Sequence, residues 1–200
     1  LITPDGAIYC VDDNGHKVLK FSEDGELLLT LGTGIPSDTS CTNKVYTTIQ
    51  KAAPPFNYPT GIAVSSKGEM YITDGYGNAR VHHFSADGRL IKSWGNPGTG
   101  KGEFCIPHGI CMDEAAGILY VTDRENGRIQ LFDFDGEFID AWNDVVYRPN
   151  AIRLSNDGYL VVACLGHRYG AYPAAVRNEQ KQRALKEGNG IPWSSVCILE

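Results

Sequence analysis

The feature that most constrains the fold of this chain is an internal repeat roughly forty residues long, a period typical of stacked structural units. Four segments align: one ends at Gly32, two run from Tyr58 to Gly95 and from Ile106 to Trp142, and the last starts at Arg148. They share a glycine (Gly6, Gly68, Gly117, Gly158), a tyrosine (Tyr9, Tyr71, Tyr120), an aspartate (Asp12, Asp74, Asp123) and a phenylalanine (Phe21, Phe84, Phe132). A unit of this length cannot bury its apolar face alone, so successive units must stack on one another.

Each repeat has the pattern of short β-strands joined by tight turns. Apolar and polar residues alternate, as in the run from Arg128 to Leu131, which is typical of a strand with one buried face. Asp-Gly pairs, which favour two-residue hairpin turns, are found at Asp5-Gly6, Asp24-Gly25, Asp87-Gly88, Asp135-Gly136 and Asp157-Gly158. We therefore predict an all-β fold, a β-propeller of four-stranded blades. The expected blades cover about 1–32, 56–95, 104–142 and 147–200 of a single propeller domain.

Two segments interrupt the repeat. Residues 33–55 lengthen the connection between the first two blades, and residues 166–190 interrupt the fourth. Both are expected on the surface of the ring, either as solvated loops or as lids and contact surfaces. A propeller hides its sheet edges by closing its ring, and four blades rarely close one. We therefore expect these four blades to be part of a six-bladed ring in a longer protein.

Composition and charge argue against several classes of partner. The net charge is −6, and the 18 Lys and Arg residues are scattered, without the basic stripe and stacking aromatics of a nucleic-acid surface. No apolar run approaches the roughly 18 residues that cross a bilayer, and the 200 residues contain no signal-peptide pattern. We expect neither nucleic acid nor a membrane as a partner, and the compartment is left open. The six cysteines never form a CxxC pair, which argues against a zinc knuckle.

One histidine departs from the repeat where function is expected. The innermost strand of a blade opens with Pro59-Thr60-Gly61 in the second repeat, Pro107-His108-Gly109 in the third and Pro149-Asn150-Ala151 in the fourth. Because this strand lines the central channel, His108 is expected to point toward the ring axis. A lone histidine at a strand start is more often a packing residue than a metal ligand, and the pattern leaves both interpretations open.

The loops after the second strand of each blade add two candidates, Tyr76 in the second repeat and Arg124 in the third. In a meander, the start of the first strand and the end of the second lie at the same end of the blade. We therefore expect Tyr76, Arg124 and His108 to share one rim of the channel. A phenol can act as a base, a guanidinium binds carboxylates and an imidazole ligates metals.

Three segments of the chain resemble the signature segments of peptidyl-α-hydroxyglycine α-amidating lyase and of related bacterial NHL-repeat propellers. They run from Asp74 to Val81, from Pro107 to Ile110 and from Asp123 to Phe132. The resemblance extends over nearly the whole chain outside the two insertions. It implies a six-bladed ring with a catalytic zinc ion (Zn²⁺) held by three histidines. His108 would be one of them, and the other two would lie outside residues 1–200. The resemblance also suggests a structural calcium ion (Ca²⁺).

The resemblance further implies a reaction and roles for three residues. Such an enzyme splits a peptidyl-α-hydroxyglycine, which is a carbinolamide, into a peptide amide and glyoxylate. Zinc would lower the pKa of the substrate hydroxyl, Tyr76 would take its proton, and Arg124 would orient the tyrosine or the substrate carboxylate. Gly77 and Tyr120 stand where animal members of the family pair cysteines, so a bacterial-type relative is expected.

Two other functions are compatible with the same residues. The chain could be a non-catalytic NHL propeller that binds a protein or a ligand on its channel face. A weaker alternative is a lactonase-like hydrolase, in which carboxylates and asparagine hold the channel metal; Asn150 is suitably placed for this role. A histidine in a Pro-His-Gly setting upstream of Leu1, and another downstream of Glu200, would favour the lyase.

Overall fold

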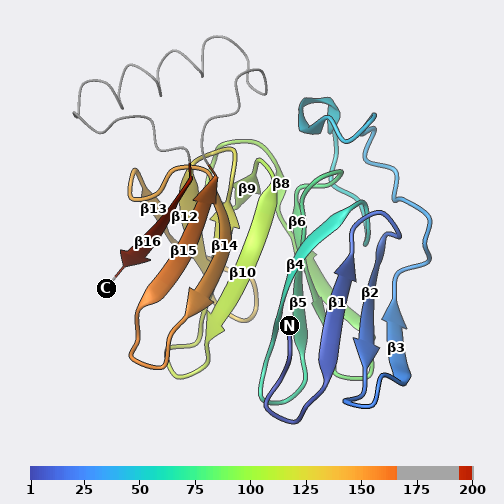
Figure 1. The fold of residues 1–200 in the computed structure, drawn as a ribbon. Coiled ribbons are helices and arrows are strands. Elements are labelled where there is room, and N and C mark those ends of the chain that lie inside the picture. The colour runs from blue at the N-terminus through green and yellow to red at the C-terminus, as the bar shows by residue number, and fades with distance from the viewer. Residues whose placement is uncertain (166–193, 200) are drawn as a thin grey trace.

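The computed structural model of the protein consists of four antiparallel sheets that stand side by side (Figure 1). It describes residues 1–165 and 194–199. Within these residues the only helical element is the 3-10 turn η1 (Tyr46–Thr48). No helix among them is long and apolar enough to span a bilayer. The prediction of an all-β fold built from meanders is therefore confirmed. The predicted insertion 166–190 falls outside the described residues.

In every sheet the strands follow one another in chain order, as in an up-and-down meander. The second sheet contains β4 (Pro59–Val64), β5 (Met70–Asp74), β6 (Arg80–Phe84) and β7 (Leu90–Trp94). The third contains β10 (Pro107–Asp113), β11 (Ile118–Asp123), β12 (Arg128–Phe132) and β13 (Phe138–Asn143). The short parallel pair β8 (Asn96–Pro97) and β9 (Glu103–Phe104) lies in the connection between these two sheets.

The two outer sheets have three described strands each, where the sequence predicted four. The first sheet contains β1 (Ile8–Asp12), β2 (Lys17–Phe21) and β3 (Leu27–Leu31). These correspond to the second to fourth strands of a blade, and a bridge between Ile2 and Ile8 marks where the innermost strand pairs. The fourth sheet contains β14 (Pro149–Leu154), β15 (Leu160–Leu165) and β16 (Ser194–Leu199).

Apolar side chains that alternate along the strands form three cores, one between each pair of neighbouring sheets. Ile62, Ile72 and Phe84 contribute to the core against the first sheet, while Tyr71 and Val81 face the third sheet. A further core, which includes Ile129, Ile152 and Val162, joins the third and fourth sheets. Burying one such side chain contributes about 1.5–3 kcal/mol, so the stacking predicted from the repeat is the main source of stability.

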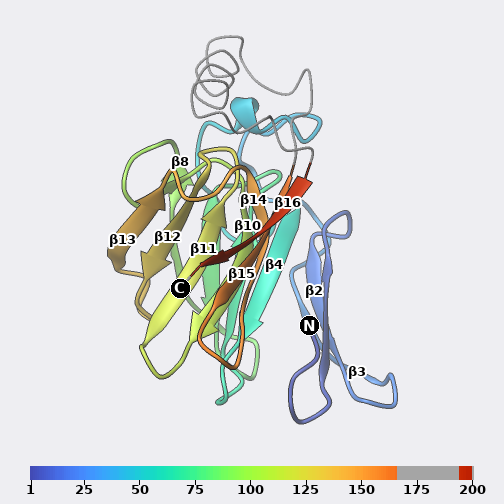
Figure 2. The same ribbon diagram turned by 60° about the vertical axis from the view of Figure 1, so that its left-hand side comes forward.

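The innermost strands β4, β10 and β14 lie next to one another, and each begins at the upper end of its sheet as drawn in Figures 1 and 2. Glycines permit this close approach. A Cβ atom at Gly109 would lie 2.7 Å from the carbonyl oxygen of Asn150, and one at Gly75 would lie 2.0 Å from that of Pro107. Both distances are too short for any side chain, so glycine at these positions lets adjacent blades meet at the channel.

Candidate active site

A repeated backbone turn places the candidate residues at the upper rim of the channel. Tyr58, Ile106 and Arg148 have left-handed φ angles of 59°, 59° and 43°, and each precedes the proline that opens an innermost strand. The carbonyl oxygen of Tyr58 accepts the N–H of Tyr76 at 3.3 Å, and that of Ile106 accepts the N–H of Arg124 at 3.1 Å. The loop after each second strand is thereby held beside the start of an innermost strand.

The hydrogen bonds of His108 assign its tautomer. Its Nδ1 lies 2.9 Å from the carbonyl oxygen of Asn150, which can only accept, so Nδ1 carries the proton. The Nε2 lone pair faces the hydroxyl of Tyr76 at 2.9 Å. Burial, and then the charge of Arg124, lower the pKa of His108 to about 4. The imidazole is therefore neutral near pH 7, the form in which histidine binds metals.

Arg124 completes the group. Its Nη1 lies 3.4 Å from the hydroxyl oxygen of Tyr76 and 3.4 Å from the side-chain oxygen of Asn150. The guanidinium carbon also lies 5.2 Å from the centre of the Tyr76 ring. The structure thus brings His108, Tyr76 and Arg124, which come from two blades, into direct contact at one rim.

Sequence reasoning missed the carboxylate that holds this arginine. Glu125 Oε1 accepts from Arg124 Nε at 2.9 Å and from an Nη of Arg148 at 2.8 Å, and all three residues are buried. A buried carboxylate between two guanidiniums restricts the orientation of both. The only signal in the sequence was the adjacency of Arg124 and Glu125. Arg148 precedes the proline of the next blade, and no local pattern links it to Glu125.

A pocket of about 240 Å³ opens along the innermost strands. Thr60, His108 and Asn150, the three residues in equivalent positions of successive blades, all line it. His108 offers the donor set of a metal ligand: an Nε2 lone pair, which faces the Tyr76 hydroxyl, and an Nδ1–H oriented by a backbone carbonyl. Among residues 1–165 and 194–199, no group of three or more His, Cys, Asp or Glu side chains is arranged to hold a metal ion. The described residues therefore supply one candidate histidine ligand, His108, for a zinc ion.

Together, the fold and the rim define a β-propeller protein with a polar, histidine-containing site on its channel face. Residues 55–172 match the protein family described as a 6-bladed beta-propeller. The chain therefore belongs to the six-bladed β-propeller family.

Relatives of known name include NHL-repeat proteins and amidating lyases. NHL repeat-containing protein 3 of Homo sapiens is 39% identical over 157 residues, which are 76% of this chain and 42% of that protein. Peptidyl-alpha-hydroxyglycine alpha-amidating lyase 1 of Drosophila melanogaster is 32% identical over 142 residues, 66% of this chain and 24% of the fly protein. The chain thus spans less than half the length of either relative. The predicted resemblance to this group of propellers is confirmed.

Among solved structures, a streptogramin B lyase superposes with a TM-score of 0.58. The alignment covers 81% of this chain and 46% of that one at 20% sequence identity. A likeness at this identity supports the propeller fold alone.

Proposed function

We propose that the chain belongs to a zinc-assisted lyase that cleaves a peptidyl-α-hydroxyglycine into a peptide amide and glyoxylate. The observation that carries this proposal is the contact of Tyr76 with both His108 and Arg124, at 2.9 and 3.4 Å. Similarity to two amidating lyases, over 66% and 38% of the chain, supports the same reaction.

The reaction needs a group that takes the proton from the substrate hydroxyl while the carbon–nitrogen bond breaks. The hydroxyl carbon then becomes the aldehyde carbon of glyoxylate, and the amide nitrogen receives a proton. Tyr76 is the proton acceptor in this proposal, because its oxygen is held at the rim by two neighbours. Arg124, whose guanidinium is held in position by Glu125, stabilises negative charge on that oxygen or binds the substrate carboxylate.

His108 is the proposed zinc ligand, through Nε2. A bound zinc ion would supply a Lewis acid that polarises the substrate hydroxyl. Because Nε2 has a single lone pair, it cannot bind a metal and accept a hydrogen bond from Tyr76 at the same time. Metal binding at His108 would therefore free the Tyr76 hydroxyl for the substrate. A structural calcium ion remains part of the prediction from sequence.

The proposal is tested on the full-length protein by measuring zinc content together with glyoxylate release from an α-hydroxyglycine peptide. The His108→Ala variant is expected to lose zinc several-fold and to lose turnover. His83→Ala is the matched control, because His83 lies between blades, stacked on Tyr71 with ring centres 4.2 Å apart. Unchanged zinc content in His108→Ala would remove this residue from the metal site.

A second function has one observation in its favour: the NHL repeat-containing relative is more similar, and over more of the chain, than the fly lyase. The channel face would then bind a protein or a ligand without chemistry. Full zinc occupancy with no glyoxylate release would favour this function over the lyase.

A further inference from the structure

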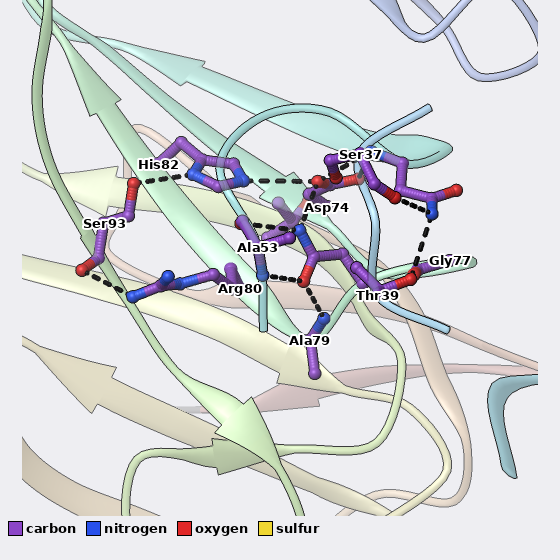
Figure 3. Close-up of polar contacts among 12 residues, drawn as sticks. Ser37, Thr39, Ala53, Asp74, Gly77, Ala79, Arg80, His82 and Ser93 are labelled. Carbon is purple, nitrogen blue, oxygen red and sulfur yellow. Dashed lines mark hydrogen bonds and ion pairs between the residues drawn. The ribbon is translucent and has the colours of Figure 1, made fainter. Parts of the chain in front are cut away.

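The insertion 33–55 is anchored on the loop that carries Tyr76 (Figure 3). The hydroxyl of Thr39 donates to the carbonyl oxygen of Gly77. At the other end of the insertion, the side chain of Asn78 donates to the carbonyl oxygen of Ala53 at 3.0 Å and accepts its N–H at 3.3 Å. Thr39 and Ala53 are buried. The insertion is therefore docked on the rim through Thr39 and Ala53.

A pocket of about 300 Å³ lies between this insertion and the entrance to the third blade. The insertion contributes Tyr46, Thr47 and Ile49 to its wall, and the blades contribute, among others, Ala79, Phe104 and Ile106. None of the described residues that line it is Asp, Glu, Lys or Arg. The pocket is therefore suited to an apolar group, and its volume is at the lower end of the range for ligand sites.

Two residues of the pocket wall also hold the loop that carries Arg124. Cys105 and Ile106 line it, and their carbonyl oxygens accept the N–H groups of Glu125 and Arg124 at 2.9 and 3.1 Å. His108 follows Ile106 by two residues. Burial raises the pKa of Tyr46 to about 12, with smaller contributions from Cys105 and Glu125 and opposing ones from Arg148 and Arg124.

We propose that this pocket is a side-chain subsite, which receives the apolar side chain of the residue preceding the α-hydroxyglycine in the substrate. This inference rests on the proposed lyase function and adds a preference for substrates with a large apolar residue at that position. The insertion 33–55 is then the specificity element, because it supplies one wall of the pocket and is attached to the Tyr76 loop.

The test uses full-length protein and two N-acetyl dipeptide substrates, with Gly or Phe before the α-hydroxyglycine. Burying a phenyl ring is expected to raise kcat/KM for the Phe substrate about 10–100-fold over the Gly substrate. Thr47→Trp fills the pocket from its exposed edge and should remove most of this ratio. Val45→Trp is the matched control, because Val45 is exposed in the same insertion and does not line the pocket.

A second measurement separates this inference from the lyase proposal. The affinities of the product amides N-acetyl-Phe-amide and N-acetyl-Gly-amide are compared by calorimetry, which needs no turnover. Tighter binding of the Phe amide, lost in Thr47→Trp but not in Val45→Trp, supports the subsite even if no glyoxylate is released. Equal kcat/KM values for the two substrates, or equal affinities where turnover is absent, overturn it. Turnover with equal kcat/KM values leaves the lyase intact without the subsite.

Discussion

The loops after β5 and β11 occupy the same place in successive blades, and each contains an asparagine, Asn78 or Asn126, but they differ in the residues that reach the rim. Each follows a fully buried aspartate, Asp74 or Asp123, which ends its strand and accepts the backbone N–H of Asn57 or Cys105 respectively. Both N–H groups precede the left-handed residue at the start of an innermost strand. Each aspartate therefore ties a loop to the channel strand of its own blade.

Each aspartate also accepts a hydrogen bond from an asparagine amide of its own loop, whereas the other side-chain partners differ. Asp74 accepts from the amide of Asn78 at 2.9 Å and lies 3.2 Å from Nε2 of His82, whose Nδ1 lies 2.8 Å from the hydroxyl of Ser93 (Figure 3). Asp123 forms an ion pair with Arg128 at 2.8 Å and accepts from the amides of Asn126 and Gln130. The repeat thus retains the anchor, whereas the residues just after it are free to differ, and those residues reach the rim as Tyr76 and Arg124.

The largest expected effect tests whether the loop after β5 carries the chemistry. Tyr76→Phe should lower kcat for glyoxylate release about 10²–10⁴-fold, the range for loss of a general base, with zinc content retained. Tyr159→Phe, at an exposed tyrosine of the fourth blade, is the control. A fully active Tyr76→Phe variant would end the role of this residue as the base.

The next effect compares the two anchors. Asp123→Asn should lower the free energy of unfolding by about 3–5 kcal/mol, because it leaves the buried guanidinium of Arg128 without its counter-ion. Asp74→Asn should cost about 1–3 kcal/mol, because its buried partners are an amide, a backbone N–H and an imidazole, none of which carries an obligatory charge. Urea denaturation of both variants measures the difference. Equal losses would mean that the ion pair of Asp123 with Arg128 adds nothing to the stability of the third blade.

The smallest effect concerns the pH dependence of folding stability, through a histidine of the second blade. His83 pairs with Tyr71 across the sheet, and Leu131 holds the equivalent position in the third blade. Burial lowers the pKa of His83. Below about pH 6.5 the His83 imidazole is therefore protonated in the unfolded chain but stays neutral in the folded chain. Stability is therefore expected to fall as the pH drops from 7 to 5. His83→Leu should reduce this slope in denaturation curves recorded at several pH values. An unchanged slope would show that His83 does not contribute to it.

The blades could be predicted because their signals are local. Strand alternation and turns such as Asp87-Gly88 and Asp135-Gly136 act within a few residues, and the structure has hairpin turns at both pairs. These turns are longer than the two-residue turns predicted, because residues 85–89 and 133–137 separate the paired strand ends. The shared rim of Tyr76, Arg124 and His108 could also be predicted. In a meander, the order of the strands determines at which end of the blade each loop lies. Their roles as base, cation and ligand stay predictions, as does the bacterial-type origin.

By itself, the amino-acid sequence determined the repeat, the strands and the end of the blade at which each candidate residue lies, since all three follow from local periodicity. Only the tertiary structure decided which side chains meet. Three features join residues from different blades or from an insertion. They are the contact between Tyr76 and His108, the ion pair of Glu125 with Arg148, and the pocket that Tyr46 lines. Such contacts depend on how neighbouring blades pack, and no spacing along the chain encodes the distance between two side chains on different sheets.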